Sequence, residues 1–174
     1  MEKENEYRIP ISGLALGQHT FHYVIKDEFF AGMDYSEVQQ GDVLVDLDIE
    51  REEYMMTLTF HINGKVLVPC DRCADEFYIP IQNDQVFFIK LGNEPIDEAD
   101  DVVALSPDEH DFDLSSLIYE FIILSIPMHR VHPEGECNPE VLALLSHDEE
   151  PVEDEEVETD PRWAALKDLT IEDN

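Results

Sequence analysis

The strand-like pattern of residues 7–91 is the strongest constraint on the fold. Short runs rich in β-branched and aromatic residues alternate there with turn residues, which is typical of strands. The apolar residues of one run alternate with Leu44 and three acids, so one face of that strand should be buried and the other solvated: Val43, Val45, Leu47 and Ile49. We therefore predict an α+β protein with an antiparallel sheet, and whether the sheet closes into a barrel is left open.

Two segments punctuate this sheet. Asn63 and Gly64 stand between the runs YMMTLTFHI and KVLVP, and an Asn-Gly pair in such a place predicts a hairpin turn. The segment FFAGMD, near residue 30, is more typical of a short helical turn or loop than of a strand.

The pattern changes period in DLSSLIYEFIILSIP, which predicts the main helix, at about 113–126. Asp113 suits the N-cap, and Pro127 marks the end. A set of residues recurs on one helical face: Leu114, Leu117, Ile118, Phe121 and Leu124 or Ser125. We expect this amphipathic helix to pack across the sheet and to supply much of the core.

The sequence predicts one domain followed by a linker and a short C-terminal helix. We predict one β-rich domain over residues 1–145 and an acidic, disordered linker over 146–159, because the linker has almost nothing to bury. A short helix is expected over 160–170, where Asp160 can cap and Pro161 suits the first helical position. An isolated helix of this length is marginal in water, so it should dock, either on its own domain or on a partner.

Charge restricts the partners. The 174-residue chain has 42 acidic residues against 10 Lys and Arg, a formal net charge of −32. Its field repels phosphate backbones and attracts cations, which disfavours broad nucleic-acid binding. The opening MEKENEYRIP lacks the pattern of a secretory signal, and no uncharged apolar stretch of about eighteen residues occurs. We expect a soluble, cytoplasmic protein with reduced thiols.

The cysteines suggest a metal site. Cys70 and Cys73 have the spacing by which a tight turn presents two thiolates to one tetrahedral ion. His132 and Cys137, beyond the predicted helix, would complete a Cys₃His set, for which zinc is the expected ion. Free thiols and a redox dithiol remain alternatives. The redox interpretation is weakened because ADEFYIPI, after the pair, is strand-like, whereas reactive dithiols sit at helix N-termini.

Basic residues flank the same segments. Arg72 lies between the two cysteines, and Arg130 lies between His129 and His132. Together they could contact a phosphate or an acidic group on a partner, or simply compensate nearby acids such as Asp71. No glycine-rich phosphate loop, GxSxG or HExxH motif occurs, so no catalytic residue is assigned and we expect a non-enzyme.

Four motifs in order, GKVLVPCDRCADEF, DLSSLIYEFIILSIP, RVHPEGEC and DPRWAALKDL, resemble the DUF177 family, whose bacterial members are called YceD. The resemblance implies a non-enzymatic factor needed for 23S ribosomal RNA accumulation and large-subunit assembly. The signature positions of the family include the four expected metal ligands, Arg72 and four residues near the C-terminus: Cys70, Arg72, Cys73, His132, Cys137, Asp160, Pro161, Arg162 and Trp163.

The resemblance implies binding to a large-subunit ribosomal protein or a pre-50S particle, with limited ribosomal RNA contact and neither a membrane nor a small-molecule substrate. Arg72, His129, Arg130, Arg162 and Trp163 are the candidate partner-binding residues. The alternatives are a thiol-disulfide oxidoreductase and an acidic chaperone for basic proteins, in which charge alone matters.

Overall fold

The computed structural model describes residues 7–33, 36–92, 102–106 and 109–147. The chain separates into two compact units, Met1–Asn138 and Pro139–Asn174. Within the described ranges, no helix combines the length and the apolar character needed to cross a membrane. The predicted helix at 160–170, including Arg162 and Trp163, and most of the predicted linker lie outside the described residues.

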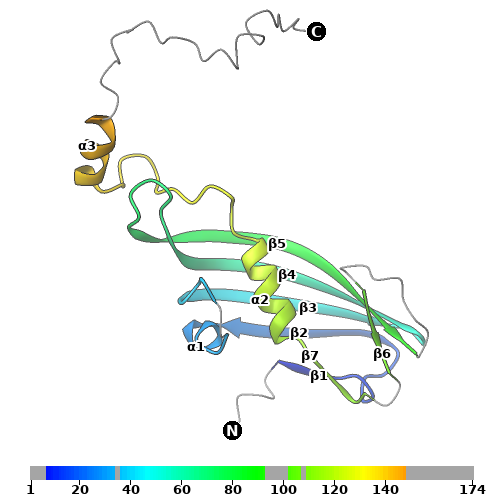
Figure 1. Cartoon of the computed structure of the whole chain (residues 1–174). Coiled ribbons are helices and arrows are strands. Elements are labelled where there is room, and N and C mark those ends of the chain that lie inside the picture. The colour runs from blue at the N-terminus through cyan, green and yellow to red at the C-terminus, as the bar shows by residue number, and fades with distance from the viewer. Residues whose placement is uncertain (1–6, 34–35, 93–101, 107–108, 148–174) are drawn as a thin grey trace, which may run out of the picture. The chain divides into compact units, whose positions relative to one another are not determined.

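A five-stranded sheet forms most of the first unit (Figure 1). Its strands lie in the order β2 (Gly17–Ile25), β3 (Gly41–Arg51), β4 (Met55–Pro69), β5 (Glu76–Leu91) and β6 (Val102–Leu105). The sheet is open, with β2 and β6 at its edges, so it does not form a closed barrel.

The prediction of an antiparallel sheet within residues 7–91 is correct for β2 to β5. The sequence analysis predicted no strand at β6, which runs parallel to β5. A parallel neighbour needs a crossover connection rather than a tight hairpin. The sequence between β5 and β6 is acidic and gave no indication of a returning chain.

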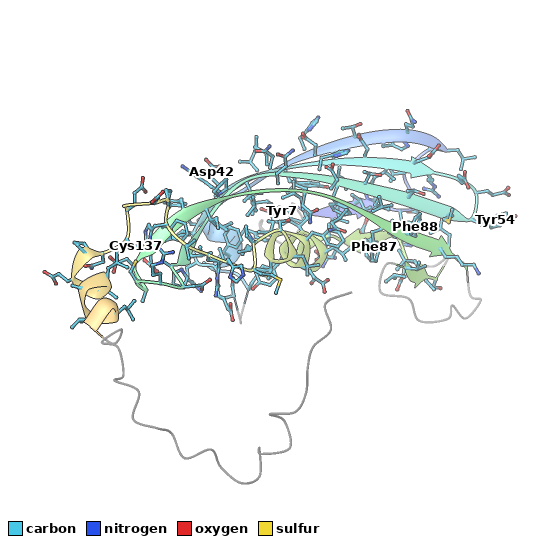
Figure 2. The ribbon with its side chains drawn as sticks, turned by 90° about the horizontal axis from the view of Figure 1, so that it is seen from above. Tyr7, Asp42, Tyr54, Phe87, Phe88 and Cys137 are labelled. Atoms are coloured by element: carbon cyan, nitrogen blue, oxygen red, sulfur yellow. The ribbon has the colours of Figure 1, made fainter. Side chains whose placement is uncertain are left out.

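One face of the sheet carries the core. Along β3 every second side chain is buried, as the alternation in its sequence predicted. The buried face is covered by α1 (Asp27–Phe30), α2 (Ser115–Leu124) and a two-stranded sheet of β1 (Arg8–Pro10) and β7 (Asp111–Asp113). Figure 2 shows the large sheet curving over these elements. Phe121 of α2 meets Phe60 of β4 edge to face, with 5.1 Å between ring centroids.

Strand β4 continues without a break through Asn63 and Gly64, so the predicted hairpin is wrong. Gly64 pairs with Val43, and a Cβ there would lie 2.4 Å from the Asp42 carbonyl oxygen and 2.6 Å from Val43 Cα. The glycine therefore permits a close approach of two backbones inside the sheet, a role that glycine also has in strands.

The predicted N-cap, Asp113, would make Leu114 the first residue of the helix, but α2 begins one residue later, at Ser115. Leu114 precedes the helix directly, and Asp113 accepts a hydrogen bond from the Ser115 backbone N–H at 2.9 Å. The Ser115 hydroxyl donates to the same carboxylate oxygen. Ile118, Phe121 and Ile122 of this helix are buried.

The second unit contains α3 (Pro139–His147), which the sequence analysis did not predict. Its Leu144 and Leu145 are exposed.

Candidate metal centre

Three thiols and one imidazole converge at one end of the sheet. Cys70 and Cys73 lie in the turn between β4 and β5, and His132 and Cys137 lie in the segment that follows α2. Their four candidate ligand atoms all lie within 4.8 Å of one another. The three cysteines are buried and unbridged, and His132 is partly buried. The structure thus brings together the four residues that the sequence analysis named as a ligand set.

The distances within this cluster fit one tetrahedral ion. Two thiolates bound at about 2.3 Å to one zinc stand about 3.8 Å apart. The Sγ atoms of Cys70 and Cys137 are 3.9 Å apart. His132 Nδ1 lies 3.4 Å from Cys73 Sγ and 3.9 Å from Cys137 Sγ. The cluster can therefore hold a metal ion without large rearrangement.

The Cys70–Cys73 turn is closed by its own backbone. Cys70 N–H donates to the Asp75 carbonyl at 2.9 Å, and Ala74 N–H donates to the Cys70 carbonyl at 2.9 Å. Arg72 N–H points at Cys70 Sγ, 3.4 Å away. Ala74 has a φ of 62°, in the left-handed region that costs a residue with a Cβ about 1 kcal/mol. This conformation reverses the chain, so that both thiols point to one side.

The segment after α2 is attached to this turn by polar contacts. The Asp71 N–H donates to the Arg130 carbonyl at 2.7 Å, and the Arg130 N–H donates to Asp71 Oδ2 at 2.7 Å. The Arg130 guanidinium lies 3.3 Å from Asp71 Oδ1. Farther along, Asn138 donates to the Asp75 carboxylate at 3.1 Å. These contacts bring the two halves of the cluster together across about sixty residues of chain.

His132 is oriented by an aromatic neighbour. Its ring lies over Phe77 of β5, with 4.4 Å between centroids and 34° between planes. Gly135, with a φ of 87°, turns the chain between His132 and Cys137. Glycine adopts this backbone conformation without a steric penalty.

The cluster also separates the protonation states of its thiols. Burial alone raises the pKa of Cys70, but hydrogen bonds from the backbone N–H groups of Cys73, Arg72 and His132, and from the His132 ring, outweigh it and lower the pKa to about 6. Burial, reinforced by the sulfur atoms of Cys70 and Cys73, raises the pKa of Cys137. One thiolate is therefore favoured at neutral pH even without a metal.

Arg72 and Arg130, the two arginines predicted for this region, differ in how accessible they are to a partner. The side chain of Arg130 is two-thirds buried and engages Asp71, in line with local charge compensation. Arg72 is exposed, and its side chain has no hydrogen bond or ion pair in the described part of the chain. His129 is also exposed. The sequence analysis treated Asp71 only as a neighbouring acid and missed its role in joining the two halves.

The first unit is thus an α+β domain built on an open sheet. At one end of the sheet lies a Cys₃His cluster that can hold a metal ion. A family model described as "Large ribosomal RNA subunit accumulation protein YceD" matches residues 58–170, about two thirds of the chain, and the chain belongs to this family. The matched range includes both halves of the cluster. The family name assigns its members a role in the accumulation of large-subunit ribosomal RNA. Neither a curated protein nor a solved structure matches the chain.

Proposed function

We propose that this protein is a non-enzymatic binding factor for the assembling large ribosomal subunit. A zinc ion in the Cys₃His cluster would hold the Cys70–Cys73 turn against residues 129–137, and the turn would present Arg72 to a subunit component. The observation that carries the proposal is the convergence of four ligand atoms within 4.8 Å at a turn that also contains an exposed Arg72, in a chain of this family. The Arg72 side chain has no hydrogen bond or ion pair in the described part of the chain.

Zinc suits the cluster because three thiolates and one imidazole are its usual structural ligands, and the softness of sulfur disfavours magnesium and calcium. Catalytic zinc sites keep a coordination position open for water or substrate, whereas four protein ligands close the site. The composition of the cluster therefore supports a structural role for the ion.

Charge supports a protein component as the main partner. At a net charge of −32 the body of the molecule repels bare RNA and attracts basic ribosomal proteins. The exposed Arg72 could add one charge-assisted hydrogen bond to a phosphate or carboxylate, which would fix the position of the turn on the particle.

The test is binding to large-subunit assembly intermediates at physiological salt. Arg72→Ala should weaken binding about tenfold, the effect of losing one charge-assisted hydrogen bond. Lys65→Ala is the matched control, because it removes the same charge from the exposed face of β4, where the ammonium lies over the Tyr78 ring, and it should leave binding within about twofold. Equal binding of wild type and Arg72→Ala would exclude a role for Arg72 in binding and favour a charge-based chaperone, and tight binding to protein-free 23S RNA would exclude a protein-first mechanism.

A thiol-disulfide oxidoreductase is the second candidate, favoured by the lowered pKa of Cys70 and by the 3.9 Å between its sulfur and that of Cys137. The turn between two strands and the burial of all three thiols speak against it. Turnover of a small disulfide substrate by metal-free protein, abolished by Cys70→Ser, would favour this candidate over the binding factor.

A further inference from the structure

Strand β2 is an open edge of the large sheet. Along Gly17–Ile25 it pairs with β3 on one side only. On its other side, no backbone group of the described residues hydrogen-bonds to it. An edge strand presents a row of unpaired N–H and C=O groups, which is a template for pairing with another extended chain.

The sequence of β2 does not protect this edge. Natural edge strands discourage pairing with charged side chains, especially lysine, with proline, or with bulges. The run GQHTFHYVI contains no Lys, Arg, Asp, Glu or Pro, although charged residues make up 30% of the whole chain. Its register with β3 is unbroken over all nine residues, so no bulge interrupts it. The edge is therefore competent for strand addition.

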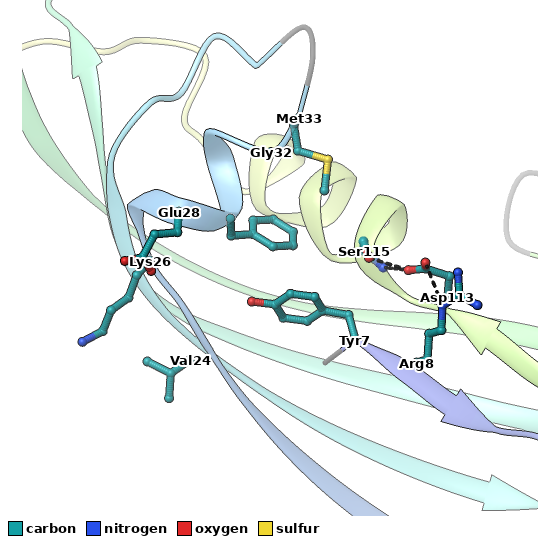
Figure 3. A pocket seen from close by; sticks show the side chains of 10 residues that line it. Tyr7, Arg8, Val24, Lys26, Glu28, Gly32, Met33, Asp113 and Ser115 are labelled. Carbon is teal, nitrogen blue, oxygen red and sulfur yellow. Dashed lines mark hydrogen bonds and ion pairs between the residues drawn. The ribbon is translucent and has the colours of Figure 1, made fainter. Parts of the chain in front are cut away.

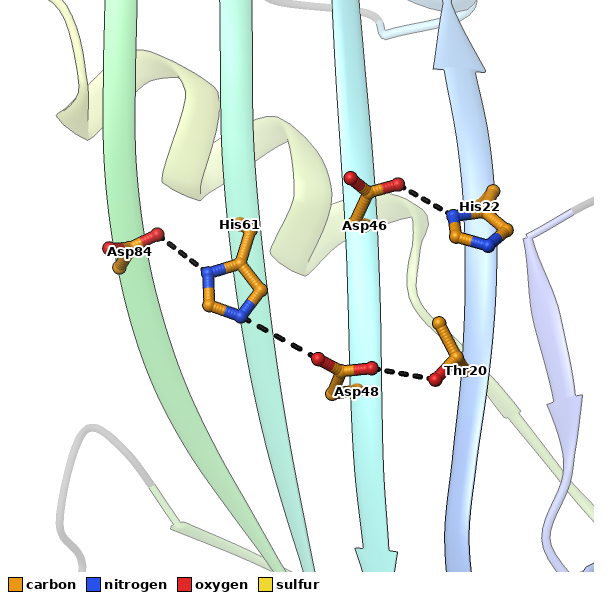
Figure 4. A network of polar contacts seen from close by, with 6 residues as sticks. All are labelled: Thr20, His22, Asp46, Asp48, His61 and Asp84. Atoms are coloured by element: carbon orange, nitrogen blue, oxygen red, sulfur yellow. Dashed lines mark hydrogen bonds and ion pairs between the residues drawn. The ribbon is translucent and has the colours of Figure 1, made fainter.

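The neighbouring strand gives this edge an electrostatic preference. On the outer face of the sheet, Thr20 of β2 stands opposite Asp48 of β3, and Gln18 stands opposite Glu50. Figure 4 shows the Thr20 hydroxyl donating to Asp48, at 2.7 Å. A strand added to β2 would lie about 4.8 Å from it and two such spacings from β3. An extended lysine or arginine on the added strand could lean across the small Thr20 towards the β3 carboxylates.

The same outer face carries a row of alternating histidines and acids. His22 Nδ1 lies 2.6 Å from Asp46, and His61 Nδ1 lies 2.7 Å from Asp84 (Figure 4). Asp46 and Asp84 thus already have partners on the sheet. Asp48 also has partners, since it accepts from Thr20 and lies 3.7 Å from His61 Nε2. Glu50 is exposed and has no hydrogen bond or ion pair among the described residues, so it is the acid most available to an added strand.

A pocket lies where β2 ends. Its volume is about 680 Å³, and Figure 3 shows Tyr7 and Met33 on one side and Val24 on the other. Val24 points to the outer face and is 52% exposed, whereas Phe29, beneath the inner face, is buried. The pocket therefore opens at the edge of the sheet rather than over either face. In strand addition, main-chain hydrogen bonds give affinity and such pockets give side-chain specificity.

We propose that the free edge of β2 binds an extended segment of a partner protein that carries lysines or arginines, by strand addition. The occupant is cationic because the adjacent β3 carboxylates and the net charge of −32 favour it. A second copy of this chain would bring the same acidic face and the same net charge, and the two would repel. This surface differs from the Cys₃His cluster, so the inference can hold or fail independently of the zinc-held turn.

The experiment uses the full chain and a short synthetic peptide in which lysine alternates with threonine and valine. Binding is measured by isothermal titration, and backbone amide signals are followed by NMR. Binding should perturb β2 amides first. A peptide of the same sequence, N-methylated on alternate residues so that its donors are blocked, should bind at least about tenfold more weakly, because several backbone hydrogen bonds are lost at unchanged charge.

A pair of matched variants tests the electrostatic part. Asp48→Asn with Glu50→Gln should weaken peptide binding about fivefold or more, since both carboxylates lie beside β2. Glu76→Gln with Asp84→Asn removes the same charge from the outer face of β5, three strands away, and should change binding little. Equal binding of both peptides would overturn the proposal. So would concentration-dependent dimerisation that protects the β2 amides, because a second copy would then occupy the edge.

Discussion

Asp71 and Arg130 bond to each other three times: backbone N–H to backbone carbonyl, backbone N–H to carboxylate, and guanidinium to carboxylate. Each residue is next to or near a candidate metal ligand, Asp71 beside Cys70 and Arg130 two positions before His132. The pair therefore joins the two halves of the cluster through protein contacts alone.

Asp71→Ala should reduce zinc affinity about tenfold, the usual effect of removing a group that supports metal ligands. It removes two of the three bonds to Arg130 and leaves the four ligands unchanged. Competition with a chromophoric chelator measures the change. Glu76→Ala, which removes an exposed carboxylate on β5, is the control. Equal affinity in the two variants would mean that the metal alone positions residues 129–137.

Purified, untagged protein should contain about one zinc per chain, as a single four-ligand cluster requires. Cys70→Ser and His132→Gln should each lower the zinc content sharply and reduce thermal stability, since structural zinc can contribute about 10 kcal/mol to the folding of small domains. His129→Gln is the matched control, because His129 lies three residues away but outside the cluster. Metal-free wild type under reducing conditions, unchanged by added zinc, would contradict the site.

In chelated protein, the ultraviolet absorbance of thiolate should titrate with a midpoint near pH 6, the lowered pKa of Cys70. The folded state then binds fewer protons than the unfolded state between about pH 6 and the ordinary value of 9.0. The free energy of unfolding should consequently rise with pH across this window and lose this contribution as pH falls through 6. Cys70→Ser should remove both the titration and the slope, and a midpoint near 9 in wild type would refute the assignment.

Gly64→Ala should destabilise the protein by about 2 kcal/mol or more, because its Cβ would overlap backbone atoms of β3 that cannot move aside. Gly13→Ala is the matched control, since its Cβ would meet Pro10 at an ordinary 3.5 Å. Chemical denaturation of both variants gives the comparison. Equal stability would show that β3 and β4 separate easily at this point.

Burial raises the pKa of Tyr23 to about 12 from 10.0. Between these values the unfolded chain loses the phenolic proton while the folded protein keeps it, so the free energy of unfolding should fall as pH rises through this window. Tyr23→Phe should show a shallower fall and keep the ring contact with Tyr7. Tyr54→Phe, at an exposed position, should behave as wild type. Equal slopes in wild type and Tyr23→Phe would contradict the shift.

Local chemistry made part of this molecule predictable. Alternation in β3 marked its buried face, and the spacing of Cys70 and Cys73 with a later His and Cys gave the ligand set that the structure brings together. In β3 and in each half of the ligand set the signal lies within a few residues, where side-chain chemistry and backbone period are directly visible.

What could not be predicted depends on contacts between distant segments. Gly64 resembled a turn residue in the sequence. A glycine is needed there because the backbone of Val43 lies against it, and Val43 is twenty-one positions earlier in the chain. The parallel pairing of β6 and the attachment of Arg130 to Asp71 likewise depend on how the chain returns. In a chain with 42 acids, nothing in the sequence around Asp71 indicates that this residue pairs with Arg130.

The separation of the metal ligands also sets an order of events in the life of the chain. His132 and Cys137 are synthesised after both strands of the β4–β5 turn, and in the folded protein their segment follows α2, which is packed on the sheet. Closing so long a loop costs conformational entropy before any ligand bond forms. Metal capture would thus come last in maturation, so that a bound ion would distinguish finished molecules from nascent or misassembled ones.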